Sequence, residues 1–168
     1  MNIKQAIKIC TLSILLCTAT AFAKNPPKFT DYPATASYQP KTGTRPPLRL
    51  TTQTARRYTT AIHRAYNEAP NFGGHLHVVS WGCGTDCRNI AVLDYETGQV
   101  YTLPGVNEIS GAMGNDDERV DFRPDSRLLI IAGSLDRARP ADKFYYVWTG
   151  RRLKRIFTEP LAVDSRDR

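Results

Sequence analysis

The stretch that decides the fold is HLHVVSWGCGTDCRNIAVLDYETGQVYTL, residues 75–103. It contains three runs rich in β-branched and other apolar residues, separated by two short segments that carry glycine and aspartate. Such runs, bounded by turn residues, are typical of β-strands. Asp94 at the entry and Gly98 at the exit of the second turn suit a hairpin with one left-handed residue. The stretch therefore predicts three strands joined by hairpins.

The remaining sequence adds one helix and three more strands. Apolar residues recur at helical spacing over residues 52–67, and Pro70 ends the pattern. Strand-like runs follow at residues 126–133, 143–148 and 152–157. Short, closely spaced strands favour antiparallel pairing, and the chain is too short for a closed propeller. We expect a mainly β (α+β) fold: one N-terminal helix, then an antiparallel meander of about six or seven short strands with blade-like hairpins, in an open twisted sheet or a small two-sheet barrel.

The first 23 residues have the order of a secretory signal peptide. Lys4 and Lys8 precede a short apolar run, and Ala21-Phe22-Ala23 offers a small-residue cleavage site. Cleavage after Ala23 predicts a periplasmic or secreted protein with no transmembrane segment, and the loss of two lysines lowers the net charge from +7 to +5. Processing at Cys17 as a lipoprotein is the less favoured alternative. Residues 24–50 are proline-rich and predict an extended arm or linker, which leaves residues 51–168 as a single globular domain.

Two cysteines, Cys83 and Cys87, lie beyond the predicted cleavage site. In an oxidising compartment neighbouring thiols pair, and three intervening residues allow a tight loop, so we predict a disulfide. A zinc site that adds His75 and His77 is an alternative, but its spacing is unusual for zinc, and C-x3-C is not a thioredoxin-type redox motif. We predict no catalytic residue, no metal and no cofactor.

The predicted disulfide would form a rigid loop that displays its neighbours, and a second loop at residues 108–119 has an acidic tip. Loops held on a rigid scaffold commonly carry recognition. The candidate binding residues are His75, His77, Trp81, Asp86, Arg88, Ser110, Asp116, Asp117 and Glu118. Four basic residues in GRRLKR, residues 150–155, are interpreted as solvated surface charges, and contact with an envelope phosphate or an acidic partner surface is the less favoured alternative.

Four segments resemble one family of small exported bacterial proteins: NFGGHLHVVSWGCGTDC, IAVLDYETGQVYTLP, RPDSRLLII and YYVWTGRRLKRI. The family pattern is NF(A/G)GH…WGCGTxC…D…TGxVY…DSxLL…YxWxG, and the resemblance covers residues 71–156. It implies export and one shared domain, and it implies no activity. Leu76 stands where the family commonly has tyrosine, so no hydroxyl-dependent role is expected there.

Composition and motifs favour a non-enzymatic module that binds a protein partner. Export disfavours nucleic acid as a partner despite the basic balance, and no serine lies in a G-x-S-x-G elbow. The leading hypothesis is an inhibitor or immunity-type protein that inserts a loop into a partner enzyme, because small exported proteins that guard the periplasm are similar in size and stapling. The alternatives are an envelope hydrolase with a spatially assembled histidine-containing site, and a small-ligand or zinc-binding module.

Overall fold

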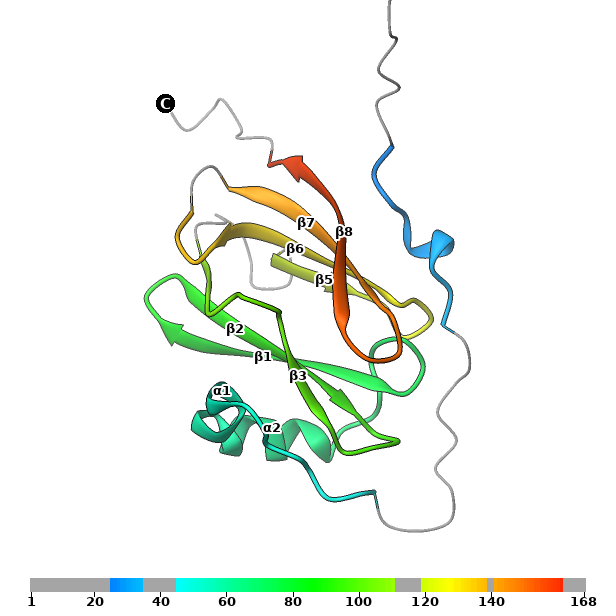
Figure 1. Cartoon of the computed structure of the whole chain (residues 1–168), viewed down its shortest axis with the longest axis vertical. Coiled ribbons are helices and arrows are strands. Elements are labelled where there is room, and N and C mark those ends of the chain that lie inside the picture. Colours follow the sequence, from blue (N-terminus) through cyan, green and yellow to red (C-terminus); the bar gives the residue numbers. More distant parts are fainter. Residues whose placement is uncertain (1–24, 35–44, 111–118, 139–140, 162–168) are drawn as a thin grey trace, which may run out of the picture.

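The computed structural model of the chain describes residues 25–34, 45–110, 119–138 and 141–161 (Figure 1). The helical elements are the 3-10 turn η1 (Phe29–Asp31) and the α-helices α1 (Gln53–Arg57) and α2 (Thr59–Tyr66). The strands are β1 (Leu76–Gly84), β2 (Cys87–Asp94), β3 (Val100–Thr102), β4 (Ile109–Ser110), β5 (Val120–Phe122), β6 (Leu128–Leu135), β7 (Asp142–Trp148) and β8 (Leu153–Pro160). None of the described helices has the length and apolar character needed to cross a membrane.

The eight described strands form one open antiparallel sheet. Its hydrogen-bonded path runs β1-β2-β4-β6-β7-β8, with β3 paired to β2 and β5 paired to β6. Every strand pair is antiparallel. Strands β1 and β8 end the path and do not pair with each other, so the described sheet does not close into a barrel. These features confirm the mainly β, antiparallel prediction and select the open sheet over the small barrel.

The predicted single helix over residues 52–67 is wrong in one respect, because two short helices occupy this segment. Tyr58, with φ −108° and ψ 30°, leaves the helical region between α1 and α2, and its ring packs 4.9 Å from that of Trp81. Ala55, Ile62 and Ala65 are nevertheless all buried. The apolar spacing therefore identified the buried face of the segment, whereas the break coincides with a tertiary contact that spacing does not record.

The described elements stack in three layers, with the helices below β1–β3 and with β5–β8 above them in Figure 1. The single sheet is folded so that the layer of β1–β3 faces the layer of β5–β8. We call the core between these two layers the intersheet core, and it includes Val78, Val92, Ile131 and Trp148. The helix core lies on the opposite face of β1 and β2 and contains apolar side chains from both helices. Strand β2 therefore buries both of its faces, which explains why IAVL reads as a continuous apolar run instead of an alternating one.

The described parts of the predicted arm pack against the domain. Residues 25–34 reach the turn before β6, where the Ala34 amide donates to the Asp125 carbonyl over 2.7 Å. Residues 45–50 run along the helix core, and the Arg49 amide donates to the Gly98 carbonyl over 2.8 Å. Gly98 has φ +71°, and a Cβ there would lie 2.2 Å from the Pro47 carbonyl oxygen, so only glycine fits this turn.

Candidate functional site

The predicted disulfide between Cys83 and Cys87 is confirmed, with Cα atoms 5.1 Å apart. Gly84 pairs with Cys87 at the end of the β1–β2 ladder, and only two residues turn the chain between them. Asp86, the second of these, has φ +53°, a left-handed conformation that aspartate tolerates better than most residues. We call the segment Cys83–Cys87 the knuckle. A covalent bond and a two-residue turn give it a fixed shape.

Arg119, at the end of the predicted acidic loop, is attached to the knuckle. Its guanidinium donates from Nη2 to Oδ1 of Asp86 and from Nη1 to the Asp86 carbonyl at 3.5 Å. The Arg119 side chain is only 10% exposed, whereas that of Asp86 is 47% exposed. The Nε atom of Arg119 has no hydrogen-bond partner among the described residues. A buried arginine so placed depends on Asp86 for compensation of its charge, which fixes this end of the loop.

The other end of the same loop also meets the knuckle. Strand β4 pairs with β2 so that Ser110 lies opposite Cys87, and Oε2 of Glu108 lies 3.6 Å from the Cys87 sulfur. We call the surface formed by the knuckle, Glu108, Ser110 and Arg119 the knuckle face. The predicted binding residues Asp86 and Ser110 lie on it, and Arg88 lies beside it on β2. The candidates Asp116, Asp117 and Glu118 lie outside the described residues.

A tight turn after β6 connects the knuckle face to a neighbouring cleft. Asp136 and Arg137 both have positive φ, and Oδ1 of Asp136 accepts hydrogen bonds from the amides of Asn107 at 2.8 Å and Glu108 at 3.1 Å. Nε of Arg137 donates to Oε1 of Glu108. Two left-handed non-glycine residues in succession are costly, and these contacts hold them in place.

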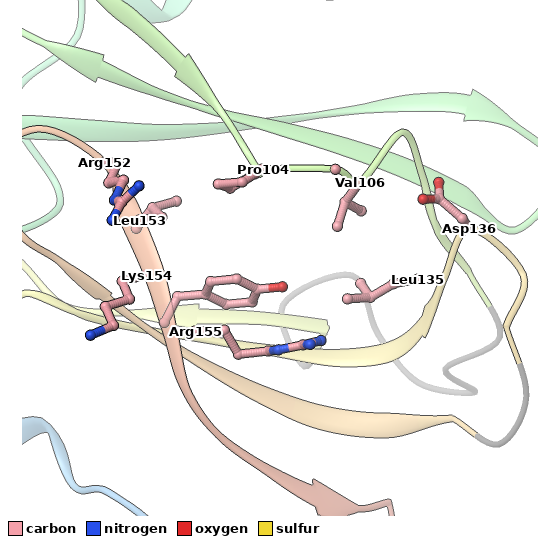
Figure 2. Close-up of a pocket in the computed structure, with 10 residues that line it drawn as sticks. Pro104, Val106, Leu135, Asp136, Arg152, Leu153, Lys154 and Arg155 are labelled. Atoms are coloured by element: carbon pink, nitrogen blue, oxygen red, sulfur yellow. The ribbon is translucent and has the colours of Figure 1, made fainter.

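The cleft has a volume of about 470 Å³ and lies between the β3–β4 connection, the end of β6 and the start of β8. Its apolar walls are Pro104, Val106, Leu135 and Leu153. Arg152 and Lys154 lie at one end and Asp136 at the other (Figure 2), while Tyr146 and Arg155 complete the lining.

The Tyr146 hydroxyl is the buried polar group of this cleft. Burial raises the pKa of Tyr146, against a smaller lowering effect of the neighbouring positive charge of Arg155. The hydroxyl is therefore protonated at neutral pH and carries a proton that it can donate. A basic rim, apolar walls and a hydroxyl give the cleft the composition of a site for an anion with an apolar part.

His75, His77 and Trp81 are engaged in other contacts. Nδ1 of His77 lies 2.7 Å from the Ala69 carbonyl oxygen, and the ring stacks on Tyr95 with centroids 6.0 Å apart. Trp81 is buried in the helix core, and Nε2 of His75 lies 4.0 Å from Oδ1 of Asp94. Within the described residues, none of the three hydrogen-bonds to the knuckle face.

The four-donor zinc site is not assembled, because both cysteine sulfurs are in the disulfide. In the described part of the chain, one other group of metal-binding side chains lies close together, namely His75, Asp94 and Glu96. Asp94 there serves the β2–β3 turn: Oδ1 accepts from the Glu96 amide at 2.8 Å, and Oδ2 accepts from the Thr97 hydroxyl at 2.8 Å. Turn formation explains this arrangement without a metal.

The histidine-containing hydrolase site considered from the sequence needs a histidine ring that can hydrogen-bond to a nucleophile. Within the described ranges, the histidine ring nitrogens contact Ala69, Asn71, Glu68 and Asp94, and none is hydrogen-bonded to a serine or threonine hydroxyl. The described residues therefore supply no activated nucleophile of this kind.

Comparisons with family models, with curated proteins and with solved structures found no match to this chain. The resemblance to a family of small exported proteins therefore stays a prediction. Sequence reasoning did not find the cleft. The sequence signal for it is the basic cluster at residues 150–155, for which solvated surface charge is the favoured interpretation from sequence.

Proposed function

We propose that this chain is an exported, non-enzymatic module that binds a protein partner through the knuckle face. Its role is that of an inhibitor or immunity-type protein: residues 108–119 enter the cleft of a partner enzyme and exclude its substrate. The leader-like first 23 residues support export. A disulfide between neighbouring cysteines is stable outside the cytoplasm, and it agrees with that location.

One observation carries the proposal: both ends of residues 108–119 are attached to the disulfide-closed knuckle. Arg119 binds Asp86 at one end, and Ser110 pairs with Cys87 at the other. A loop whose ends are fixed before binding loses less conformational entropy when it meets a partner. The buried Arg119 side chain supports a preformed base of this loop.

The competing functions have weaker support. The hydrolase hypothesis needs a histidine beside a nucleophile, and the zinc hypothesis needs two free thiolates. In the residues that the structure describes, the rings of His75 and His77 contact other groups, and both thiols are oxidised. A passive binding role needs neither group.

The experiment is a capture from the periplasm or medium of the producing cells, followed by reconstitution with the purified partner. The bait is the processed chain, and the test variant is Asp116→Ser/Asp117→Ser/Glu118→Ser, which removes the acidic charge of the loop. The control variant Glu96→Ser/Asp121→Ser/Asp125→Ser removes the same charge from exposed positions elsewhere. We expect one enzyme to bind in equal stoichiometry and to lose activity on binding.

The loop variant is expected to bind at least 100-fold more weakly, and the control variant within twofold of the parent. Retention of the partner with unchanged affinity by the loop variant would contradict loop insertion. Absence of any partner that reconstitutes from purified components would contradict the protein-binding function.

A further inference from the structure

We propose that the cleft beside the knuckle face is a binding site for an organic anion with an apolar body. This inference is independent of the proposed protein partner, because it rests on a different part of the surface. The ligand class is a carboxylate or phosphate attached to an aliphatic group. A fatty acid and a peptide that ends in an acidic residue after an aliphatic one share this chemistry.

The charge of the cleft is the first support. Arg152, in the turn before β8, and Lys154 and Arg155, on β8, line the cleft, and none of the three forms an ion pair within the described residues. The one carboxylate in the lining, Asp136, accepts hydrogen bonds from the amides of Asn107 and Glu108, and its single negative charge faces three positive side chains. The cleft therefore presents uncompensated positive charge to a ligand.

The apolar walls are the second support. Leu135 and Leu153 are buried side chains of the intersheet core, and together with Pro104 and Val106 they border the cavity. A volume of about 470 Å³ is within the usual range of small-molecule sites. Burial of an aliphatic group here would contribute roughly 25 cal/mol per Å² of apolar surface removed from water. An inorganic anion would not gain this contribution.

Tyr146 and Arg155 form the third support, because they place donors inside the cleft and not only at its rim. Tyr146 is a buried residue of β7, and the positive charge of Arg155, which lines the same cleft, lies close enough to lower its pKa. A tyrosine hydroxyl and an arginine guanidinium can each donate a hydrogen bond to a ligand oxygen. One hydroxyl and one guanidinium at the same place suit an oxyanion, which accepts from both.

The test is a titration of the ¹⁵N-labelled processed chain followed by NMR. The two anionic probes are hexanoate and acetyl-leucyl-glutamate, which represent the acyl and the peptide source. Hexan-1-ol supplies the same apolar body without charge, and inorganic phosphate supplies charge without an apolar body. We expect the anionic probes to change the amide chemical shifts of Val106, Leu135 and Leu153 in a saturable way. The probe that binds more tightly shows whether the ligand is of the acyl or the peptide type.

Hexan-1-ol and inorganic phosphate are expected to bind at least tenfold more weakly than the better anionic probe. The variant Arg152→Gln/Lys154→Gln, which changes two exposed side chains, is expected to weaken anion binding at least tenfold. Lys143→Gln, an exposed charge on β7 outside the cleft lining, serves as control and should change binding less than twofold. Raising the salt concentration should also weaken binding, which gives a readout that needs no variant.

Three results would overturn the inference. Saturation by hexan-1-ol at the same concentration as hexanoate would remove the requirement for charge. Saturation by inorganic phosphate as tight as that by either organic probe would remove the requirement for an apolar body. Absence of saturable shifts at the three amides with both anionic probes would remove the site itself.

Discussion

Tyr145 on β7 and Glu159 on β8 form a hydrogen bond in which the tyrosine hydroxyl donates to Oε1 of the carboxylate. The Tyr145 ring also packs on Phe157, with centroids 5.4 Å apart, on the face of the sheet away from the intersheet core. Burial, and then the neighbouring Glu159 carboxylate, raises the pKa of Tyr145 well above its usual range. Both effects disfavour the phenolate in the folded state only.

This raised pKa makes the stability of the protein sensitive to alkaline pH. An unfolded tyrosine ionises near pH 10, so the favourable contribution of Tyr145 is complete below that pH and is lost as the pH rises above it. We expect the free energy of unfolding, measured with urea, to fall as the pH is raised from about 10 upward. Tyr145→Phe should lower it by about 1 kcal/mol at pH 7 and should reduce the alkaline loss.

Tyr32→Phe is the control for this prediction, because the Tyr32 hydroxyl has no hydrogen bond among the described residues. An alkaline loss as steep in Tyr145→Phe as in the parent would show that other groups are responsible. Tyr101 and Tyr146, whose pKa values burial also raises, would then be the next tyrosines to replace.

At the level of elements, the disulfide of the knuckle is a local cross-link between two residues close in sequence. The ring closed by Cys83 and Cys87 has only five residues. A cross-link over so short a loop removes little conformational entropy from the unfolded chain, and it therefore stabilises the folded state only slightly. We expect Cys83→Ser/Cys87→Ser to lower the free energy of unfolding by about 2 kcal/mol at most. NMR shift changes should be confined to the knuckle face, with the largest at Gly84, Asp86 and Ser110.

The parent protein treated with a reductant is the matched reference for that variant. The reduced parent and the serine variant should unfold at the same urea concentration. A global loss of dispersed NMR signals in either sample would show that the disulfide holds the fold together, which a five-residue ring is not expected to do.

The main strands could be predicted from sequence, whereas two short strands and the helix break could not. Six predicted runs correspond to β1, β2, β3, β6, β7 and β8, because alternation and turn residues are local signals. Strand β4 has two residues and β5 has three, which is too short for a period to be visible. Strand β3 is equally short, but the turn residues Asp94 and Gly98 before it mark a hairpin. Each is defined by its partner strand and not by its own sequence.

The candidate site was predictable to a similar extent. The knuckle was found because two cysteines and two glycines lie within a few residues of each other. The cleft was missed because it combines residues 104–106, 135–136 and 152–155, which only the sheet brings together. Asp86–Arg119 is likewise a contact between residues far apart in sequence, so no local pattern indicates it.

At the level of the whole molecule, two cores share one hairpin. Strands β1 and β2 place Val78, Ile90 and Val92 in the intersheet core, and Trp81, Ala91 and Leu93 on their other face in the helix core. The helices therefore depend on the same two strands that the layer of β5–β8 covers. Coupling through this hairpin predicts that the described domain unfolds as one cooperative unit.

The chain carries one tryptophan in each core, which allows a direct test of this coupling. Trp148→Phe leaves Trp81 as the reporter of the helix core, and Trp81→Phe leaves Trp148 as the reporter of the intersheet core. We expect the two variants to show fluorescence transitions that each coincide with the loss of circular dichroism of the same protein. In each of these two single-tryptophan backgrounds, Ile62→Ala and Ile131→Ala should lower the free energy of unfolding by about 2–4 kcal/mol, because both side chains are fully buried. If Ile62→Ala shifted only the Trp81 transition and left that of Trp148 in place, the helix layer would unfold separately, and the shared hairpin would not couple the two cores.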